Sequence, residues 1–207
     1  MTSIGLGAWL NSTFDILCVK HISIITAQFE ILKLKLVQIT EARINNIPIE
    51  TEVVKRLDRC LHLYDLLLRY VIEIEKSFSP GIFVQFASSM CVICVTGFQL
   101  VAIPLSTSKF VMYVNYLMCM LCQVIMYCWY GHFLIGSSTN IIEACYMSDW
   151  LNCSHDIRKS LILMMERAKK PVSMRALNFF TLSLPTLITV LKSSYSYLAV
   201  LQHIYSK

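Results

Sequence analysis

The sequence predicts an all-α integral membrane protein: a helical bundle of about four transmembrane helices plus two cytoplasmic amphipathic helices. Two observations on its composition point this way, because 56% of the 207 residues are hydrophobic and only 15% are charged. A third is that residues 81–108 and 110–142 contain no charged side chain. Soluble domains average about 25% charged residues, and uncharged runs of about 20 residues or more are typical of membrane spans.

The first predicted span covers residues 12–32 and is the weakest, because it contains Asp15, Lys20 and Glu30. Ionisable side chains within a span usually face the interior of a bundle. For Asp15 the alternative is a side chain that reaches the outer interface. Asn11 starts a glycosylation sequon, and we expect it outside the cell as a candidate acceptor. Its closeness to the membrane argues against modification.

Residues 50–76 are predicted to form a cytoplasmic helix that begins after the break at Pro48. Its apolar residues alternate at spacings of three and four, as in a seam between packed helices. The predicted seam consists of Val54, Leu57, Leu61, Tyr64, Leu68 and Val71. Acidic residues alternate with basic ones on the other faces, which argues against binding to a membrane surface.

The second and third predicted spans cover residues 81–104 and 110–135, joined by a short outer link. Tyr113 and Tyr116 share one helical face near the outer end of the third span. They are either interfacial tyrosines or ligand-facing ones, and position alone favours the interface.

A second cytoplasmic helix is predicted over residues 155–170, and the last span over residues 176–205. The helix has one apolar stripe, which consists of Ile157, Leu161, Met164, Met165 and Ala168. Pro171 ends it, and we expect it to join the last span directly. The last span holds Lys192 and several hydroxyls, which fits the wall of an aqueous path. The alternative is a buried helix whose hydroxyls bond to their own i−4 carbonyls.

The placement of basic residues predicts the topology. Of the 18 Lys and Arg residues, 14 lie in residues 33–79 and 140–175, whereas the link between the second and third spans has only Lys109. The positive-inside rule places the two basic connections in the cytoplasm and both termini outside.

Metal, cofactor and enzyme functions are not expected. The nine cysteines include two CxxC pairs, at residues 91–94 and 119–122, but each pair lies inside an apolar span, where cysteine behaves as a small hydrophobe. No nucleophile, base and orienting group converge in one loop, and we expect no nucleic-acid partner.

Several stretches, in their order and spacing, resemble the insect odorant receptor family. They are residues 127–131 (YCWYG), 144–150 (ACYMSDW), 158–159 (RK), 169–171 (KKP) and 191–197 (LKSSYSY), with residues 14–15 and 28–32 resembling the family's fourth span. The resemblance implies a seven-span receptor of the plasma membrane of olfactory neuron dendrites, with an extracellular C-terminus. It also implies a cation channel gated by a small volatile hydrophobic ligand, formed as a heterotetramer with a co-receptor subunit. The family's first three spans are missing, so the chain is expected to be partial.

The resemblance also assigns roles to residues. Pore and gate positions would be Ser196, Val200, His203 and Ile204, and odorant-binding positions would be Phe14, Cys18, Tyr113 and Tyr116. The subunit anchor would include Leu57, Leu61, Tyr64, Leu161 and Met165. Leu198 departs from the aromatic residue that is usual in the family. The main alternative is a four-span membrane scaffold or adaptor without ligand gating.

Overall fold

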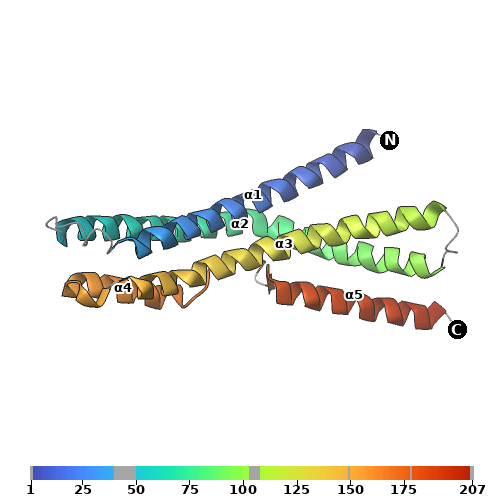
Figure 1. Ribbon diagram of the computed structural model, residues 1–207. Coiled ribbons are helices and arrows are strands. Elements are labelled where there is room, and N and C mark those ends of the chain that lie inside the picture. The colour runs from blue at the N-terminus through green and yellow to red at the C-terminus, as the bar shows by residue number, and fades with distance from the viewer. Residues whose placement is uncertain (1, 40–49, 103–107, 149, 178, 206–207) are drawn as a thin grey trace. The chain divides into compact units, whose positions relative to one another are not determined.

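The computed structural model describes residues 2–39, 50–102, 108–148, 150–177 and 179–205, and almost all of them are helical (Figure 1). The elements are α1 (Thr2–Val37), α2 (Glu50–Ala102), α3 (Ser108–Met147), the 3-10 turn η2 (Trp150–Asn152), α4 (His155–Ala168), β1 (Arg175–Ala176), β2 (Phe180–Thr181) and α5 (Leu184–Tyr205). The predicted all-α class is confirmed.

The chain folds into two compact units, each built from segments that are far apart in the sequence. Unit 1 combines residues 1–19, 76–132 and 174–207, and unit 2 combines residues 20–75 and 133–173. Helices α1, α2 and α3 each contribute one part to unit 1 and the other part to unit 2.

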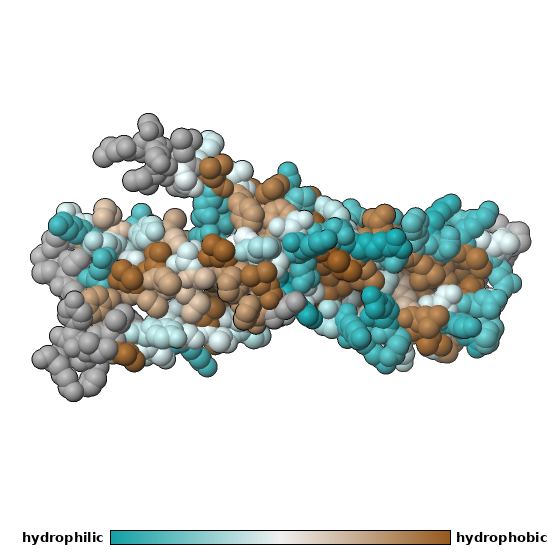
Figure 2. Space-filling view, turned by 180° about the vertical axis from the view of Figure 1, so that it is seen from behind, coloured by the Kyte–Doolittle hydropathy of each residue, from teal (hydrophilic) through white to brown (hydrophobic). Residues whose placement is uncertain are grey.

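Charge divides sharply between the two units. Of the 31 charged residues in the sequence, 25 belong to unit 2, although it is the smaller unit. On the face that Figure 2 shows, hydrophilic side chains gather over unit 2, while apolar and weakly polar ones cover most of unit 1. Unit 2 therefore has the surface of a water-exposed bundle, and unit 1 has a surface suited to lipid.

Unit 2 is a bundle of four helical segments whose interior follows heptad spacing. On α1 the buried residues are Ile22, Ile25, Phe29, Leu32 and Leu36, and on α2 they are Val53, Leu57, Cys60, Tyr64, Leu67, Val71 and Ile74. Both series alternate steps of three and four, which keeps one face of each helix against its neighbours. α4 runs alongside the last part of α3 and buries Ile157, Leu161, Met164 and Ala168 (Figure 1).

The predicted seam on residues 50–76 coincides only in part with the stripe of α2 that is buried within the chain. Leu57, Tyr64 and Val71 are buried, but Val54 is 47% exposed, and Leu61 and Leu68 are only partly covered. The other buried members of the stripe are Val53, Cys60, Leu67 and Ile74. Two stripes with three–four spacing can share every second residue, so spacing alone could not choose between them.

Unit 1 holds the remaining parts of α1, α2 and α3 together with α5 and a short hairpin. The hairpin pairs β1 with β2 in antiparallel register, with Arg175 opposite Thr181. Its strand residue Phe180 packs on Phe86 with ring centroids 5.0 Å apart, and Phe86 packs edge-on to Tyr127 at 5.8 Å. Each fully buried apolar side chain of this kind contributes about 1.5–3 kcal/mol.

Two helices of the described chain, over Glu50–Leu100 and Ser108–Met147, are long and apolar enough to cross a membrane. The predicted count of four spans is therefore not confirmed by length and composition. Apolar side chains point outward along α3, among them Val111, Met112 and Met118, each more than half exposed. A contiguous exposed apolar surface of this kind fits lipid contact.

The first predicted cytoplasmic helix and the second predicted span are one continuous helix, with no break at the predicted boundary between them. α2 is one helix of 53 residues with Pro80 inside it. Proline removes one hydrogen bond to the carbonyl four residues earlier but fits where the surrounding packing holds the helix.

The predicted first span conflicts with the predicted cytoplasmic helix. The rings of Phe29 and Tyr64 pack edge to face, with centroids 6.4 Å apart, and His21 Nδ1 shares a 2.9 Å hydrogen bond with the Tyr70 hydroxyl. Residues 21–29 therefore lie beside residues 64–70 and share their surroundings. Residues 12–32 cannot all be in lipid while residues 50–76 are all in water.

The predicted direct junction between the second cytoplasmic helix and the last span is wrong. α4 ends at Ala168, the hairpin occupies residues 175–181, and α5 begins at Leu184 rather than at Ala176. Leu177 turns the chain with a φ of 46°, a left-handed conformation that costs a non-glycine residue roughly 1–2 kcal/mol. Its backbone N–H donates to the Ser79 hydroxyl at 2.6 Å, which helps to hold the turn.

Candidate functional site

Unit 1 contains a carboxylate that is satisfied by neutral donors. The Tyr127 hydroxyl donates to Asp15 Oδ1 at 2.7 Å, and the Gln123 amide donates to Asp15 Oδ2. Gln123 and Tyr127 are four residues apart, so both face α1 from one side of α3. Asp15 is half-buried where α1 meets α3, and ionisable groups in a span usually face other helices in this way.

An aromatic contact lies one residue away from this carboxylate. Phe14 packs against Phe78 with ring centroids 5.5 Å apart, and its ring also covers Gly81 on α2. A Cβ added at Gly81 would meet ring atoms Cε1 and Cε2 of Phe14 at 3.1 Å. Glycine therefore lets α1 and α2 approach closely at this level.

The four predicted odorant-binding residues do not share one level of the structure. Phe14 and Cys18 lie one turn apart on α1, and Cys18 is fully buried. Tyr113 and Tyr116 lie 14 and 11 residues before Tyr127 on α3, which is about 16–21 Å along that helix. Tyr116 is 49% exposed. A ligand-binding role for any of the four stays a prediction.

The pore prediction concerns α5, whose described side chains, those of residues 184–197, 199 and 200, are buried along one narrow stripe. Val190 and Ser194 are buried, whereas Ser196 and Val200 are exposed, Val200 to 57%. The Ser194 hydroxyl donates to the Val190 carbonyl at 2.9 Å, as in the buried-helix alternative. His203 and Ile204 belong to α5, but their side chains lie outside the described residues.

The outward surface of α5 is large and mostly apolar. Its exposed residues include Ile188, Leu191, Tyr195, Tyr197 and Val200. An open cavity of about 650 Å³ lies at the start of the helix, lined by Arg175, Phe179, Phe180, Thr181, Ser183, Pro185, Thr186 and Thr189. A helix covered on one stripe alone needs lipid or another protein surface on its remaining faces.

In unit 2, two grooves open between α2 and α4. One has a volume of about 120 Å³ and includes Asp58, Leu61 and Ser160, and the other, of about 480 Å³, includes Leu61, Leu68 and Leu163. Leu61 lines both grooves and is only half-buried, because it belongs to the part of the predicted seam that the interior does not use.

The predicted anchor residues fall into two groups. Leu57, Tyr64 and Leu161 are buried and hold the subunit's own helices together, whereas Leu61 and Met165 are partly open. Burial raises the pKa of Tyr64, and the nearby charge of Arg167 opposes this shift. A role in anchoring subunits stays a prediction for all five residues.

Buried thiols in unit 2 are protonated and structural. Burial raises the pKa of Cys145 to about 12 and also raises that of Cys60, where the charge of Lys35 opposes the shift. A thiol must ionise to act as a nucleophile or metal ligand. In the described part of the chain, no three His, Cys, Asp or Glu side chains lie together as a metal site would require.

Sequence reasoning missed several polar contacts between helices. The Ser137 hydroxyl donates to Glu30 Oε1 at 2.7 Å, and the Val172 backbone N–H donates to the Ser138 hydroxyl at 3.0 Å. Serines inside an apolar run carry no signal of their partner, because a hydroxyl can equally bond to its own helix. Asn11, the candidate glycosylation site, is exposed on α1, and its modification stays a prediction.

These features define a helical membrane protein with a charged, water-exposed helical unit. The profile of the 7tm odorant receptor family matches residues 1–195, and the chain therefore belongs to this family, the odorant receptors of insects. The resemblance drawn from the sequence is confirmed. Members of the family are multi-pass proteins of the plasma membrane and are receptors rather than enzymes.

Individual relatives agree with this assignment. Odorant receptor 94a of Drosophila melanogaster is 27% identical over 206 residues, which cover 99% of this chain and 52% of the relative. Putative odorant receptor 85d of the same species is 34% identical over 133 residues, covering 64% of this chain and 32% of the relative. Odorant receptor Or2 of Anopheles gambiae is 26% identical over 150 residues, which cover 72% of this chain and 39% of the relative. The chain thus spans about half the length, or less, of these curated relatives.

Solved structures share the fold. The insect olfactory receptor OR5 from Machilis hrabei in complex with eugenol superimposes with a TM-score of 0.76 at 17% identity, over 92% of this chain and 47% of that receptor. Another structure of the same receptor gives a TM-score of 0.73 at 18% identity, over 94% of this chain and 47% of that receptor.

Proposed function

We propose that this chain is part of an odorant-gated cation channel subunit, which binds a small volatile hydrophobic ligand and assembles with a co-receptor subunit into a heterotetramer. The observation that carries the proposal is the uncovered surface of α5. A helix that buries little more than one stripe, in an odorant receptor, is suited to line a pore shared with neighbouring subunits. The family match favours this receptor over a four-span scaffold.

The proposal places unit 1 in the membrane and unit 2 in the cytoplasm. Support comes from the partition of charge, since only six of the 31 charged residues belong to unit 1. The membrane part of α1 is then residues 2–19 rather than residues 12–32. This placement removes the conflict between Phe29 and Tyr64, because both residues are then in the cytoplasm. The C-terminus is extracellular, as the positive-inside rule predicts.

Val200 is the gate residue that the described side chains best support. An apolar constriction closes a pore because permeating ions find no hydration partners there, so the pore dewets. Val200 and Ile204 are four positions apart on α5, and positions at this spacing fall on one helical face. The exposed side chain of Val200 is available for such a constriction, whereas the buried Val190 is not.

The test is Val200→Ser in a complete receptor that carries this sequence, co-expressed with its co-receptor. Wetting the constriction should raise the current without odorant several-fold, measured by two-electrode voltage clamp. The matched control is Val190→Ser, which changes the same residue type at a buried position of the same helix and should lower surface expression without a leak. A tightly closed channel with normal odorant responses in Val200→Ser would remove Val200 from the gate.

The same proposal gives the grooves between α2 and α4 a role as subunit anchor. They combine half-buried apolar residues, Leu61 and Leu68, with the charges of Asp65 and Arg167 at their edges. A surface with an apolar centre and a polar rim is typical of a protein–protein interface. The occupant we propose is unit 2 of a neighbouring subunit, which presents the same kind of surface.

A further inference from the structure

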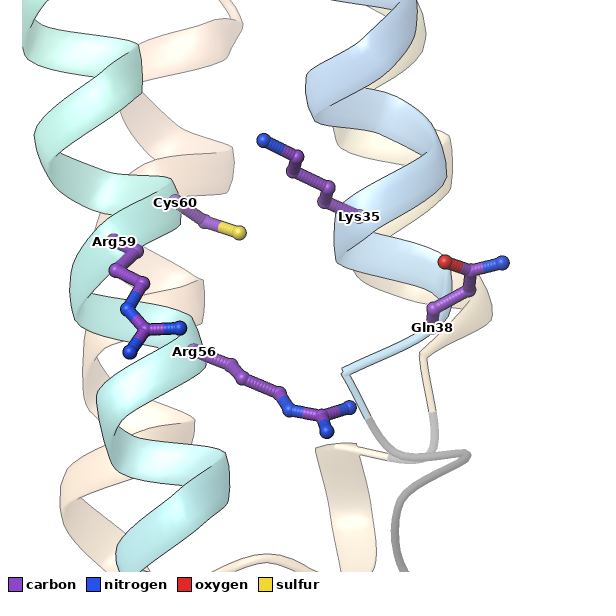
Figure 3. A pocket seen from close by; sticks show the side chains of 5 residues that line it. All are labelled: Lys35, Gln38, Arg56, Arg59 and Cys60. Carbon is purple, nitrogen blue, oxygen red and sulfur yellow. The ribbon is translucent and has the colours of Figure 1, made fainter.

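A third cavity in unit 2 has a different chemistry from the two grooves. It lies between α1 and α2, has a volume of about 210 Å³, and is lined by Lys35, Gln38, Arg56, Arg59 and Cys60. Figure 3 shows Lys35 reaching from α1 toward α2 and Arg56 reaching from α2 toward α1, with Arg59 and Cys60 on the α2 side. Of the five described residues that line it, three carry a positive charge and none is acidic.

In the part of the chain that the structure describes, Arg59 has no acidic partner of the kind that other basic residues have. Arg69 pairs with Asp65 at 2.7 Å, four residues earlier on its own helix. The positions three and four residues from Arg59 hold no acid; they are Lys55, Arg56, His62 and Leu63. Asp58, its neighbour in sequence, lines the groove toward α4 instead.

Lys35 is in the same situation on the opposite wall. The positions three and four residues away from it are Ile31, Leu32, Gln38 and Ile39. Among the described residues neither Lys35 nor Arg59 takes part in an ion pair, whereas Arg56 bonds to Glu52 at 3.2 Å. Like charges that converge on one space repel each other, and an anion placed between them relieves that repulsion.

We propose that this cavity binds a small multivalent phosphate anion. The guanidinium groups of Arg56 and Arg59 present planar sets of donors that match phosphate oxygens, and Lys35 adds a point charge from the other wall. The Gln38 amide contributes a neutral donor at the edge of the cavity. None of these four residues belongs to the proposed gate or to the anchor grooves, so a test of this site is independent of the gate and anchor proposals.

The phosphate has two possible sources, a soluble polyphosphate or the headgroup of a phosphoinositide. Arg59 lies 22 residues before Gly81 on α2, which is about 33 Å of helix. On the proposed membrane placement, Gly81 is near the start of the lipid-facing part. This separation favours a soluble anion, and the experiment needs one arm for each source.

The first arm uses the full chain in detergent and inorganic tripolyphosphate, measured by isothermal titration calorimetry at 50 mM and 150 mM salt. Binding should be detected, should weaken at the higher salt, and should weaken at least tenfold in Lys35→Gln and in Arg59→Gln. Arg59→Lys keeps the charge but loses the planar donors, so its affinity for tripolyphosphate should lie between those of the original chain and of Arg59→Gln. The matched control is Arg69→Gln, an exposed arginine of the same helix, which should leave binding unchanged.

The second arm measures flotation of the same proteins with vesicles that contain phosphatidylinositol bisphosphate or an equal charge of phosphatidylserine. Binding of tripolyphosphate supports the site with a soluble ligand. Selective binding to the phosphoinositide that is lost in Arg59→Gln supports it with a lipid ligand. The proposal is overturned if neither probe binds, or if Arg69→Gln weakens binding as much as Arg59→Gln does.

A rival explanation for Lys35, the cation on the α1 wall of the cavity, makes a different prediction. α1 ends at Val37, and Lys35 in its last turn could serve only to balance the negative end of the helix dipole. In that case Lys35→Gln lowers the melting temperature while tripolyphosphate binds neither the original chain nor the variant. That outcome overturns the phosphate site.

Discussion

Asp15 shows how a half-buried carboxylate can be held between membrane helices with no cationic partner among the described residues. Two neutral donors from α3 satisfy its oxygens, so no second charge has to be buried with it. The residue was recognisable from the sequence as a charge inside a predicted span. Its partners were not, because the sequence does not say which face of α3 meets α1.

Replacing Tyr127 tests this arrangement. Tyr127→Phe keeps the ring and its packing on Phe86 but leaves one oxygen of Asp15 without its donor. A buried polar atom without a partner costs about 1–3 kcal/mol, so the free energy of unfolding should fall by that amount in a denaturant titration of the chain in detergent.

The control is Tyr116→Phe, which removes a hydroxyl from an exposed position of the same helix and should change stability by less than about 0.5 kcal/mol. Equal stabilities of the two variants would show that the Tyr127 hydroxyl contributes nothing to holding Asp15.

At the scale of elements, Gly131 on α3 sets the distance to the chain just before α5. A Cβ built at Gly131 lies 2.6 Å from Leu182 Cβ and 2.9 Å from Leu182 C, so a side chain there must push the segment away. We expect Gly131→Ala to destabilise the chain by about 1–3 kcal/mol, measured as a lower melting temperature in detergent.

Gly136 on the same helix is the matched control, because a Cβ built there meets nothing within 4 Å. Gly136→Ala should be neutral or should stabilise by about 0.5–1 kcal/mol, as expected for alanine in a helix interior. If Gly131→Ala and Gly136→Ala have the same melting temperature, the close approach of Gly131 to Leu182 does not determine the position of the segment before α5.

The element that carries the anchor proposal is the half-buried stripe of α2. Leu61→Asp in a complete receptor places a charge in the proposed interface, and co-purification with the co-receptor should fall at least tenfold. Leu66→Asp makes the same change at a position of α2 that is more than half exposed and lines neither groove, and it should co-purify normally. Normal co-purification of Leu61→Asp would exclude the groove as the anchor.

The elements also show where prediction from sequence ends. The spacing on α2 identified a packed helix, but the stripe buried within the chain contains Cys60 and Leu67, whereas the predicted seam contains Leu61 and Leu68. Pattern alone cannot separate two stripes that both repeat every seven residues. The hairpin before α5 was missed because its strands are two residues long and lie within an apolar run.

For the whole molecule, topology is the property that charge predicts most directly. A tag after Lys207 should stain on intact cells, and a tag near Asn46 should stain only after permeabilisation, because 14 of the 18 basic residues lie in the two connections assigned to the cytoplasm. Immunofluorescence with both tags checks this expectation. Staining in the opposite pattern would invert the orientation and the placement of unit 2.

Composition and resemblance were enough to predict the all-α class, the membrane setting and the family. The division into two units was beyond reach, because three helices run through the border without a break and the sequence shows no linker there. On the proposed placement the membrane part of α1 ends before Lys20, whereas the predicted span continued to residue 32 because residues 12–32 are mostly apolar.

The unbroken course of α2 over 53 residues also fixes the rotational phase of its side chains about the helix axis. Each residue of a helix turns the chain by about 100°, so one residue inserted near Ser77 would rotate every later position of α2 by that angle and advance it by about 1.5 Å. The stripe of Val53, Leu57 and Tyr64 would then stay in register while Ile82 and Phe86 turned away from their neighbours. A loop would absorb such an insertion, but α2 has none between Glu50 and Ala102, so the change in length displaces the packed side chains that follow it on the helix.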